Sequence, residues 1–328
     1  MPSGVAVVLR TKDRPLFLER AVASVLGQTH DDLELVVVND GGDPAAVDEV
    51  VARAADARIQ VLHNPASEGM VAATNRALAA SASTFVAVHD DDDTWAPGFL
   101  ARTVAHLETS GAMGVVATAD RVVERVVDGR IELLSSERLF PELRFVSLYR
   151  LCFENLATPI AFLYRREALA TVGGYEERFG GAADWEFALR FVGAFEVDYL
   201  RSEQALAFYH HRPDATGIET NSVYTDEHRR LESRIANELL RADLAAGRLG
   251  LGLIVNAVRF GYEADERMFA REKEAMDERV EYLASCVAKV DRRVEALQEA
   301  VTPSARLKAD LAFVRQLPRA VARRLGRG

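Results

Sequence analysis

The chain has 328 residues, enough to bury one large core and to carry an extension beyond it. With 49% hydrophobic residues and a net charge of −10, its composition is typical of a globular protein and argues against a disordered chain or a general nucleic-acid binder. The charge is uneven: residues 303–328 hold seven Lys and Arg against one Asp, a net charge of +6, which leaves −16 on the rest.

Two cysteines, Cys152 and Cys286, lie far apart without the spacing of a metal site, which favours a reducing compartment. The chain enters an apolar run at Val5–Leu9 without a basic leader, so no signal peptide is expected. No apolar stretch approaches the roughly 18 residues of a membrane-spanning helix. We therefore expect a cytoplasmic protein.

Strand and helix signals alternate over the first 120 residues, as in βαβ units. Proline suits the first turn of a helix, and three of the helical stretches begin with one. The expected strands are Val5–Leu9, Leu33–Val38, Ile59–Leu62, Phe85–Val88 and Gly114–Thr118. The expected helices are Pro15–Leu26, Pro44–Ala55, Gly69–Ala80 and Pro97–Thr109. This order predicts an α/β fold with a mostly parallel sheet flanked by helices.

The pattern is mixed from residue 120 to 222 and becomes helical after Ser222. Its clearest elements are Tyr164–Val172, a helix from Asp184 to Val192, and strands near Glu196–Leu200 and Ala205–Tyr209.

A heptad repeat follows, with apolar residues spaced alternately by four and three. It predicts self-association into a short parallel bundle, because the 3.5-residue period holds throughout. An amphipathic helix packed on its own domain is the alternative. The repeat consists of Met276, Val280, Leu283, Val287, Val290, Val294, Leu297 and Val301.

Residues 303–328 combine an apolar stripe with arginines, and Pro318 interrupts the stripe. Such a basic amphipathic segment is typical of proteins that lie on an anionic membrane surface. A disordered, solvated tail is the alternative.

The most informative segment is Asp90–Asp93, four consecutive aspartates after the apolar run Phe85–Val88. Carboxylates at the end of a strand lie where open α/β sheets bind ligands. Because four adjacent negative charges repel one another, we expect positive charge beside them, and Mg²⁺ or Mn²⁺ is the obvious candidate. A solvated acidic turn capping the helix that begins near Pro97 is the alternative.

Several segments, in the same order, resemble family 2 glycosyltransferases with the GT-A fold. Each is weak alone, but together they are specific, and the resemblance covers roughly residues 1–215. The segments are Val5–Pro15, Ser24–Thr29, Leu33–Gly42, Asn64–Asn75, His89–Pro97, Gly173–Glu177 and Asp184–Arg190.

The resemblance implies a nucleoside-diphosphate sugar as donor. Thr11 and Asp13, after the first strand, and Asp40, at the end of the second, are expected to bind its base or ribose. Helix N-capping is the alternative for both aspartates. Arg14 is expected to meet phosphate or to pair with Glu19.

Within the acidic segment, the resemblance assigns Asp90 or Asp91 to the ribose. It assigns Asp92 to a metal ion that bridges the two phosphates. His211 is the second metal ligand that we expect, although His210 or Arg212 could contact metal or diphosphate instead. An exposed His-His-Arg turn is the alternative.

Asp184 is, by the resemblance, the general base that takes the proton of the acceptor hydroxyl. Trp185 could stack on an acceptor sugar or be a plain core aromatic. The chain departs from the family pattern at three positions. Ala183 and Asn39 replace acidic residues, and Thr74 replaces an arginine.

These observations predict a metal-dependent inverting glycosyltransferase that uses a UDP- or dTDP-sugar to extend a glycan or lipid-linked acceptor in cell-surface polysaccharide synthesis. A nucleotidyltransferase is one alternative, although the glycine-rich loop usual after its first strand is missing. A degenerate GT-A domain serving as a coiled-coil assembly platform is the other, and the intact acids argue against it. The expected organisation is a GT-A domain at 1–222 (donor half 1–120, acceptor half 121–222), a helical segment at 223–270, a coiled-coil helix at 271–302 and the basic tail at 303–328.

Overall fold

The structure, a computed structural model, describes residues 4–221, 225–247, 273, 276–277 and 279–295. They belong to two compact units, Met1–Asn256 and Ala257–Gly328. Among these residues no helix is both long and apolar enough to cross a bilayer.

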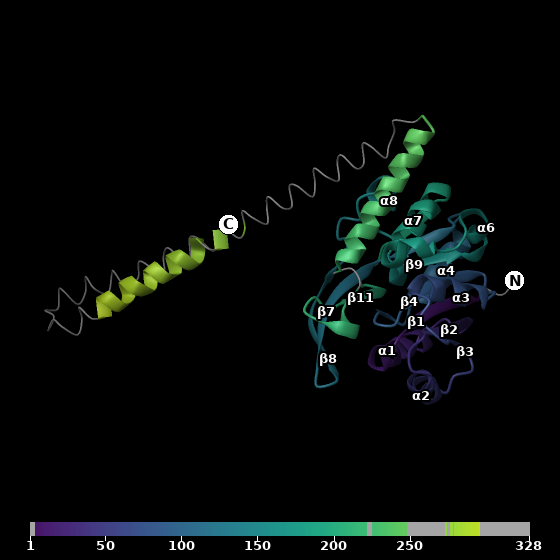
Figure 1. The fold of residues 1–328 in the computed structure, drawn as a ribbon, viewed down its shortest axis with the longest axis horizontal. Coiled ribbons are helices and arrows are strands. Elements are labelled where there is room, and N and C mark those ends of the chain that lie inside the picture. The colour runs from purple at the N-terminus through teal and green to yellow at the C-terminus, as the bar shows by residue number, and fades with distance from the viewer. Residues whose placement is uncertain (1–3, 222–224, 248–272, 274–275, 278, 296–328) are drawn as a thin grey trace. The chain divides into compact units, whose positions relative to one another are not determined.

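A seven-stranded sheet forms the centre of the first unit, in the order β10-β6-β9-β4-β1-β2-β3 (Figure 1). Strand β9 runs antiparallel to its neighbours β4 and β6, and the other neighbouring pairs are parallel. The central strands read as apolar runs because residues on both of their faces are buried. The strands are β1 (Val5–Thr11), β2 (Leu33–Asp40), β3 (Ile59–Asn64), β4 (Phe85–Asp90), β6 (Gly114–Ala117), β9 (Phe162–Arg165) and β10 (Val197–Leu200).

The helices lie between the strands along the chain, which confirms the predicted α/β class. Pro15 and Pro44 stand at the first turns of α1 and α2, as expected, and Asp43 caps α2 by accepting the Ala45 N–H at 3.0 Å. The helices are α1 (Pro15–Leu26), α2 (Pro44–Ala54), α3 (Met70–Ala79), α4 (Phe99–Thr109), α5 (Leu148–Leu151), α6 (Leu169–Val172), α7 (Ala183–Ala194) and α8 (Asp226–Ala245).

A second, four-stranded sheet has the order β5-β11-β7-β8. Its main part is an antiparallel hairpin that the sequence prediction missed. Asp128 and Gly129 form the two-residue turn, both with positive φ (50° and 72°), as a type I′ turn requires. The strands are β5 (Thr94–Trp95), β7 (Ala119–Val127), β8 (Arg130–Arg138) and β11 (Ala207–His211).

The element predicted at Tyr164–Val172 divides into three parts. The end of β9 is followed by a 3₁₀ turn, Arg166–Ala168, and then by α6. The later helix prediction was better, because α7 contains the whole of the expected range.

Three side chains in the motif segments hold loops in place. Gln28 donates to the Ala96 carbonyl at 2.9 Å and accepts the Leu100 N–H at 3.0 Å. Trp95 donates to the Ile160 carbonyl at 2.6 Å. Asn75 bonds both the N–H and the carbonyl of Tyr175, at 3.0 and 2.8 Å. Part of the family-like pattern therefore serves the scaffold.

In the second unit, residues 279–295 are helical. Three residues of the heptad stripe are about half exposed, Val280 (51%), Leu283 (48%) and Val290 (50%), whereas Val294 is buried (7%). The stripe is thus present as a helix face over these residues. Leu297, Val301 and the basic tail lie outside the described residues.

Candidate active site

A cavity of about 500 Å³ opens where β1, β2 and β4 end. The chain adds β2 and β3 on one side of β1 and then returns to place β4 on the other. The ends of β1 and β4 therefore flank the reversal of strand order, which is where open α/β sheets bind ligands. The lining includes the predicted residues Thr11, Asp13, Arg14, Asp40, Asp90, Asp91 and Asp92, with Arg10, Lys12, Ser67, Gly69, Met70, Tyr209, Ile218, Thr220 and Asn221.

The parallel register of β1 and β4 sets the first acidic contacts. Arg10 lies opposite Asp90, and their side chains form an ion pair at 2.6 Å. Thr11 Oγ1 donates to Asp91 Oδ2 at 2.7 Å. Arg14 Nε donates to Asp91 Oδ2 at 3.1 Å, and its Nη2 pairs with Asp91 Oδ1. Both oxygens of Asp91 are thus used within the protein.

Asp92 keeps one oxygen for the cavity. Its Oδ2 accepts from Arg14 Nη1 and Asn221 Nδ2, each at 3.3 Å, and from Arg212 Nη2. Desolvation opposes ionisation, but the charges of Arg14 and Arg212 prevail and lower the pKa of Asp92. Asp92 Oδ1 accepts no hydrogen bond from the part of the chain that the structure describes.

Asp93 serves the scaffold. It is 1% exposed, and its side chain accepts the His210 N–H at 2.8 Å. Desolvation and the charges of Asp92 and Asp90 raise the pKa of Asp93 well above its usual range. It holds β11 against the acidic segment.

Arginines supply the positive charge that the four aspartates require. Arg10 and Arg14 do so from β1 and the loop after it, as described above. Arg20, on α1, donates to the Asp92 backbone carbonyl and pairs with Glu124 at 2.6 Å. The solvated acidic turn is therefore wrong, because Asp91, Asp92 and Asp93 are all buried.

Asp40 binds the loop that leads into α3. Its Oδ1 accepts from Asn64 Nδ2 and from the Glu68 N–H, both at 2.8 Å. Its Oδ2 accepts from Ser67 Oγ at 2.7 Å and from the Gly69 N–H at 2.9 Å. Desolvation opposes the ionisation of Asp40, but these four hydrogen bonds favour it and lower the pKa of Asp40. Asp40 therefore caps neither α2, which Asp43 caps, nor α3, which has no side-chain cap, and it lines the cavity.

Asp13 is exposed at the rim of the cavity, with a φ of 54°. Its Oδ1 accepts the Asp43 N–H at 3.0 Å, so it ties the loop after β1 to the start of α2. A Cβ on Gly42 would lie 2.7 Å from that oxygen, which explains the glycine there. Asp13 does not cap α1, which has no side-chain cap.

Asp184 lies in the first turn of α7, where the helix dipole favours a carboxylate. Asn155 Nδ2 donates to its Oδ2 at 2.9 Å. Desolvation raises the pKa of Asp184, and the charge of Asp90 adds to the rise. Asp184 does not line the cavity, although it lies within electrostatic range of Asp90 and Arg10, which do.

Trp185 needs correction as an acceptor-binding residue. It is 5% exposed, and its indole N–H donates to the Leu151 carbonyl at 2.6 Å. An aromatic ring buried in this way cannot present a face to a sugar. The core alternative fits, and we do not place Trp185 in the acceptor site.

The His-His-Arg sequence is buried, so the exposed-turn alternative is wrong. His211 is 6% exposed, does not line the cavity, and meets the ring of Tyr209 edge to face at 4.2 Å. Burial lowers the pKa of His211 to about 4, so its imidazole is neutral. His210 Nδ1 contacts Glu124 at 2.7 Å. Arg212 is 1% exposed and lies behind Asp92.

The donor set at the cavity fits a divalent cation only in part. Within the described residues no cluster of three His, Cys, Asp or Glu side chains is arranged to hold a metal. Asp92 Oδ1 and Asp90 Oδ2 both accept no hydrogen bond there and belong to residues that line the cavity. Mg²⁺ is typically held by one or two carboxylates, substrate phosphates and water. These two oxygens suit such a site.

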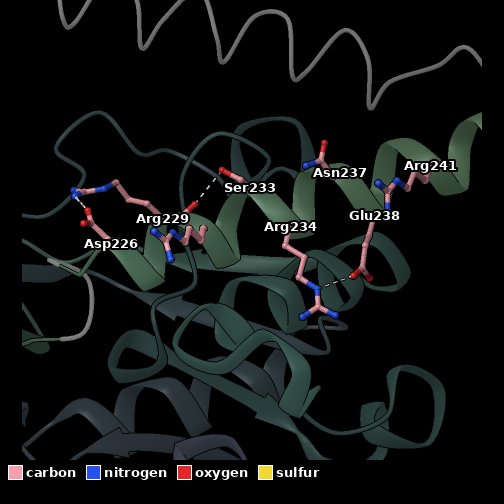
Figure 2. A pocket seen from close by; sticks show the side chains of 8 residues that line it. Asp226, Arg229, Ser233, Arg234, Asn237, Glu238 and Arg241 are labelled. Carbon is pink, nitrogen blue, oxygen red and sulfur yellow. Dashed lines mark hydrogen bonds and ion pairs between the residues drawn. The ribbon is translucent and has the colours of Figure 1, made fainter.

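A second hollow, of about 700 Å³, lies along α8 (Figure 2). Its side chains are mainly arginines and their partners: Arg229 pairs with Asp226, and Arg234 bonds Glu238 at 3.1 Å. It lacks an acid–base pair or strand-end carboxylates. The cavity at the sheet edge is therefore the candidate active site.

Several residues of the site were not predicted. Arg10, Arg20, Asn155 and Asn221 come from separate elements and contact the predicted acids only in the fold. Glu124, on a further strand, contacts Arg20, His210 and Arg212. Glu124 alone left a signal, since it interrupts the apolar pattern of a strand with a buried charge. The others look like ordinary surface residues in the sequence.

Known proteins resemble this chain in sequence. The family described as "Glycosyl transferase family 2" matches residues 6–173. An "uncharacterized glycosyltransferase" of Nostoc sp. is 32% identical over 178 residues, 51% of this chain and 52% of that protein. The "Pre-mycofactocin glycosyltransferase" of Mycobacterium tuberculosis is 30% identical over 203 residues, 59% of this chain and 41% of that protein. The chain thus spans about half the length of these relatives.

Among solved structures, S. aureus TarS 1-349 in complex with UDP-GlcNAc has a similar fold, with a TM-score of 0.56. The likeness covers 72% of this chain and 66% of TarS at 18% identity, so it concerns the fold alone.

Proposed function

The chain belongs to glycosyltransferase family 2, and from that premise we propose that it is a metal-dependent, inverting enzyme that transfers a sugar from a UDP- or dTDP-sugar to a hydroxyl of a glycan or lipid-linked acceptor. The observation that carries the proposal is the single cavity lined by Thr11, Asp13, Asp40 and Asp90–Asp92, with Asp184 within electrostatic range. Family membership and these acids argue against a nucleotidyltransferase and against a degenerate platform.

The donor lies in the sheet-edge cavity. Asp13 and Asp40 face its nucleoside half, because they stand at the ends of the first two strands. Asp90 faces the ribose. Arg14 pairs with Asp91 and Asp92 and lines the cavity, and it would also bond the diphosphate of the donor. The solved TarS complex with UDP-GlcNAc supports a donor of this chemical class.

Mn²⁺ or Mg²⁺ is the proposed cofactor. Asp92 would hold the ion, while His211, the second ligand expected from the sequence, does not line the cavity and packs against the Tyr209 ring. The bound ion would offset negative charge on the diphosphate as the bond to the sugar breaks. Thr11 and Arg14 hold Asp91 in place beside it.

Asp184 is the proposed general base. Its carboxylate removes the proton of the acceptor hydroxyl as that oxygen attacks the anomeric carbon. Attack opposite the departing diphosphate inverts the configuration, through an oxocarbenium-like transition state. The raised pKa of Asp184 suits the role, because a base is most effective when its pKa approaches the working pH.

The acceptor is proposed to belong to cell-surface polysaccharide synthesis, and residues 303–328 to bring the enzyme to an anionic membrane face. The net charge of +6 in that tail supports the membrane role. Flotation with anionic liposomes tests it: equal binding with and without residues 303–328 would contradict it.

A screen of UDP- and dTDP-sugars for Mn²⁺-stimulated transfer or hydrolysis tests the main proposal. Asp92→Asn should weaken metal-linked donor binding, whereas Asp184→Asn should lower kcat by about 10²–10⁴-fold with donor affinity retained. The surface variant Glu137→Gln is the control, since that side chain is 57% exposed and far from the acids in the sheet. Transfer left intact in both acid variants would refute the site.

A further inference from the structure

Arg212 is an arginine buried behind the acidic segment, with 1% of its surface exposed. Burying a charge costs several kcal/mol unless its partners compensate. Here every part of the guanidinium has one. Nη1 donates to Glu124 Oε1 at 2.7 Å, Nε donates to the Glu219 carbonyl at 2.9 Å, and Nη2 pairs with Asp92. The plane lies over the Phe17 ring, 4.3 Å from its centre.

These contacts join three parts of the molecule. Asp92 follows β4, Glu124 belongs to β7, and Glu219 lies in the segment 212–221 after β11. Asn221 adds a second link, because its side chain accepts the Arg212 N–H at 2.8 Å and donates to Asp92 Oδ2 at 3.3 Å. The segment 212–221 is therefore tied to Asp92 twice.

The same segment forms part of the cavity wall. Ile218, Thr220 and Asn221 line the cavity, whereas Arg212 does not. Arg212 thus cannot touch a donor in the cavity. It contacts both the carboxylate assigned to metal and the backbone that shapes the opposite wall.

We propose that Arg212 is a positioning residue for donor binding: it holds Asp92 with Oδ1 directed to the cavity and at the same time fixes the wall formed by Ile218–Asn221. The proposal rests on the proposed function, since it assumes a metal-linked nucleotide in this cavity. Lysine cannot replace arginine here, because one ammonium group cannot reach Asp92, Glu124 and the Glu219 carbonyl together in a planar fork.

The control is Arg138, an arginine outside the site that also joins separate elements. It pairs with Asp120 at 2.8 Å and donates to the carbonyls of Ser202 at 3.1 Å and Glu203 at 2.9 Å, and it does not line the cavity. A general loss of packing or charge balance should therefore weaken donor binding in Arg138→Lys as well as in Arg212→Lys. A positioning role should affect only Arg212→Lys.

The test measures binding of UDP and of dTDP in the presence of Mn²⁺ by calorimetry, on full-length protein. Arg212→Lys should weaken binding by about 10–100-fold, as loss of a residue that orients a metal ligand does, and Arg138→Lys by less than about 3-fold. Hydrogen exchange should rise at amides 214–221 in Arg212→Lys alone. Should Arg212→Lys not fold, Asn221→Ala serves instead and should weaken binding by about 10-fold.

Equal losses in the two lysine variants, or unchanged binding in Arg212→Lys, would overturn the positioning role. So would unchanged binding in Asn221→Ala. Wild-type protein that binds neither nucleotide would instead refute the proposed donor, and the role of Arg212 would fall with it.

Discussion

Asp184 must be held in one orientation if it is to receive a proton from the acceptor. Asn155 donates to its Oδ2 at 2.9 Å and the Trp185 N–H also bonds the carboxylate, so the rotation of the carboxylate is fixed. The preceding residue, Ala183, has no side chain that could do this. An amide donor from a distant segment thus fills the orienting role.

Asn155→Ala should move the pH dependence of turnover. A hydrogen bond to the ionised form lowers the pKa of a carboxyl group, so its loss raises the pKa of Asp184 above the already raised value. The other groups acting on Asp184 are Asp90, Arg10, His228 and the Trp185 N–H, and the substitution leaves them unchanged. Since the base works ionised, the rise of kcat with pH should shift upward by about one unit.

The measurement is kcat against pH at saturating donor. Glu154→Gln is the control, because Glu154 lies in the same segment and pairs with Arg150 at 2.8 Å near the surface. Its profile should match that of the wild type. A uniform fall in kcat at every pH, with no shift, would mean that Asn155 only supports the fold.

At the scale of residues, the sequence predicted the strand-end acids that line the cavity, but not the side chains that hydrogen-bond to them. Asp40, Asp91 and Asp92 stand at the expected strand ends, because apolar runs locate strands reliably. Their hydrogen-bond partners could not be predicted from the sequence. Asn221 and Arg212 lie more than a hundred residues from Asp92 in the chain, and only the crossing of β11 beside β5 brings them to it.

At the scale of elements, the first half of the fold followed from the sequence and the β7–β8 hairpin did not. Strands β1, β2 and β4 are buried on both faces and read as short apolar runs between helix signals. Strand β8 is mostly exposed and polar, so it carries no apolar run to find. The Asp128-Gly129 pair was the available signal, since it favours a tight hairpin turn.

Glu124→Gln should show that this hairpin holds the site together. Glu124 is 3% exposed and contacts Arg20, His210 and Arg212. Loss of its charge removes the carboxylate that Arg20 pairs with and one of the two that buried Arg212 pairs with, which should lower the free energy of unfolding by about 3–5 kcal/mol at pH 7. Glu137→Gln on β8 breaks a surface pair and should cost less than about 1 kcal/mol.

The difference in unfolding free energy between wild type and Glu124→Gln should depend on pH in a defined direction. Desolvation opposes the ionisation of Glu124, but the hydrogen bonds from His210 and Arg20 favour it and lower the pKa of Glu124 to about 2. A carboxyl with a lowered pKa in the folded state stabilises the protein above its ordinary pKa and loses that effect as the pH falls toward the folded value. The gap between wild type and Glu124→Gln in denaturant unfolding should therefore narrow below about pH 4.5. A gap that stays constant down to pH 3 would contradict an ionic role.

At the scale of the whole molecule, the heptad stripe of the second unit is the surface that we expect to join copies of the chain. Over 279–295 the heptad stripe is helical, with Val280, Leu283 and Val290 about half exposed and Val294 buried. Three apolar side chains on one face of a helix favour a partner that covers them. The 3.5-residue period fits a second copy of the same helix better than a flat surface.

We predict that the full-length chain associates through this stripe and that Leu283→Glu together with Val290→Glu dissociates it. Two charges facing two charges in a buried seam would cost several kcal/mol, enough to shift a micromolar equilibrium to monomer. Ser285→Glu is the control, because Ser285 lies on the opposite, exposed side of the helix and its charge should leave the mass unchanged. Sedimentation equilibrium over a range of concentrations measures the outcome. A monomeric wild type, or equal masses for the wild type and the double variant, would contradict the prediction and favour an amphipathic helix that packs within its own chain.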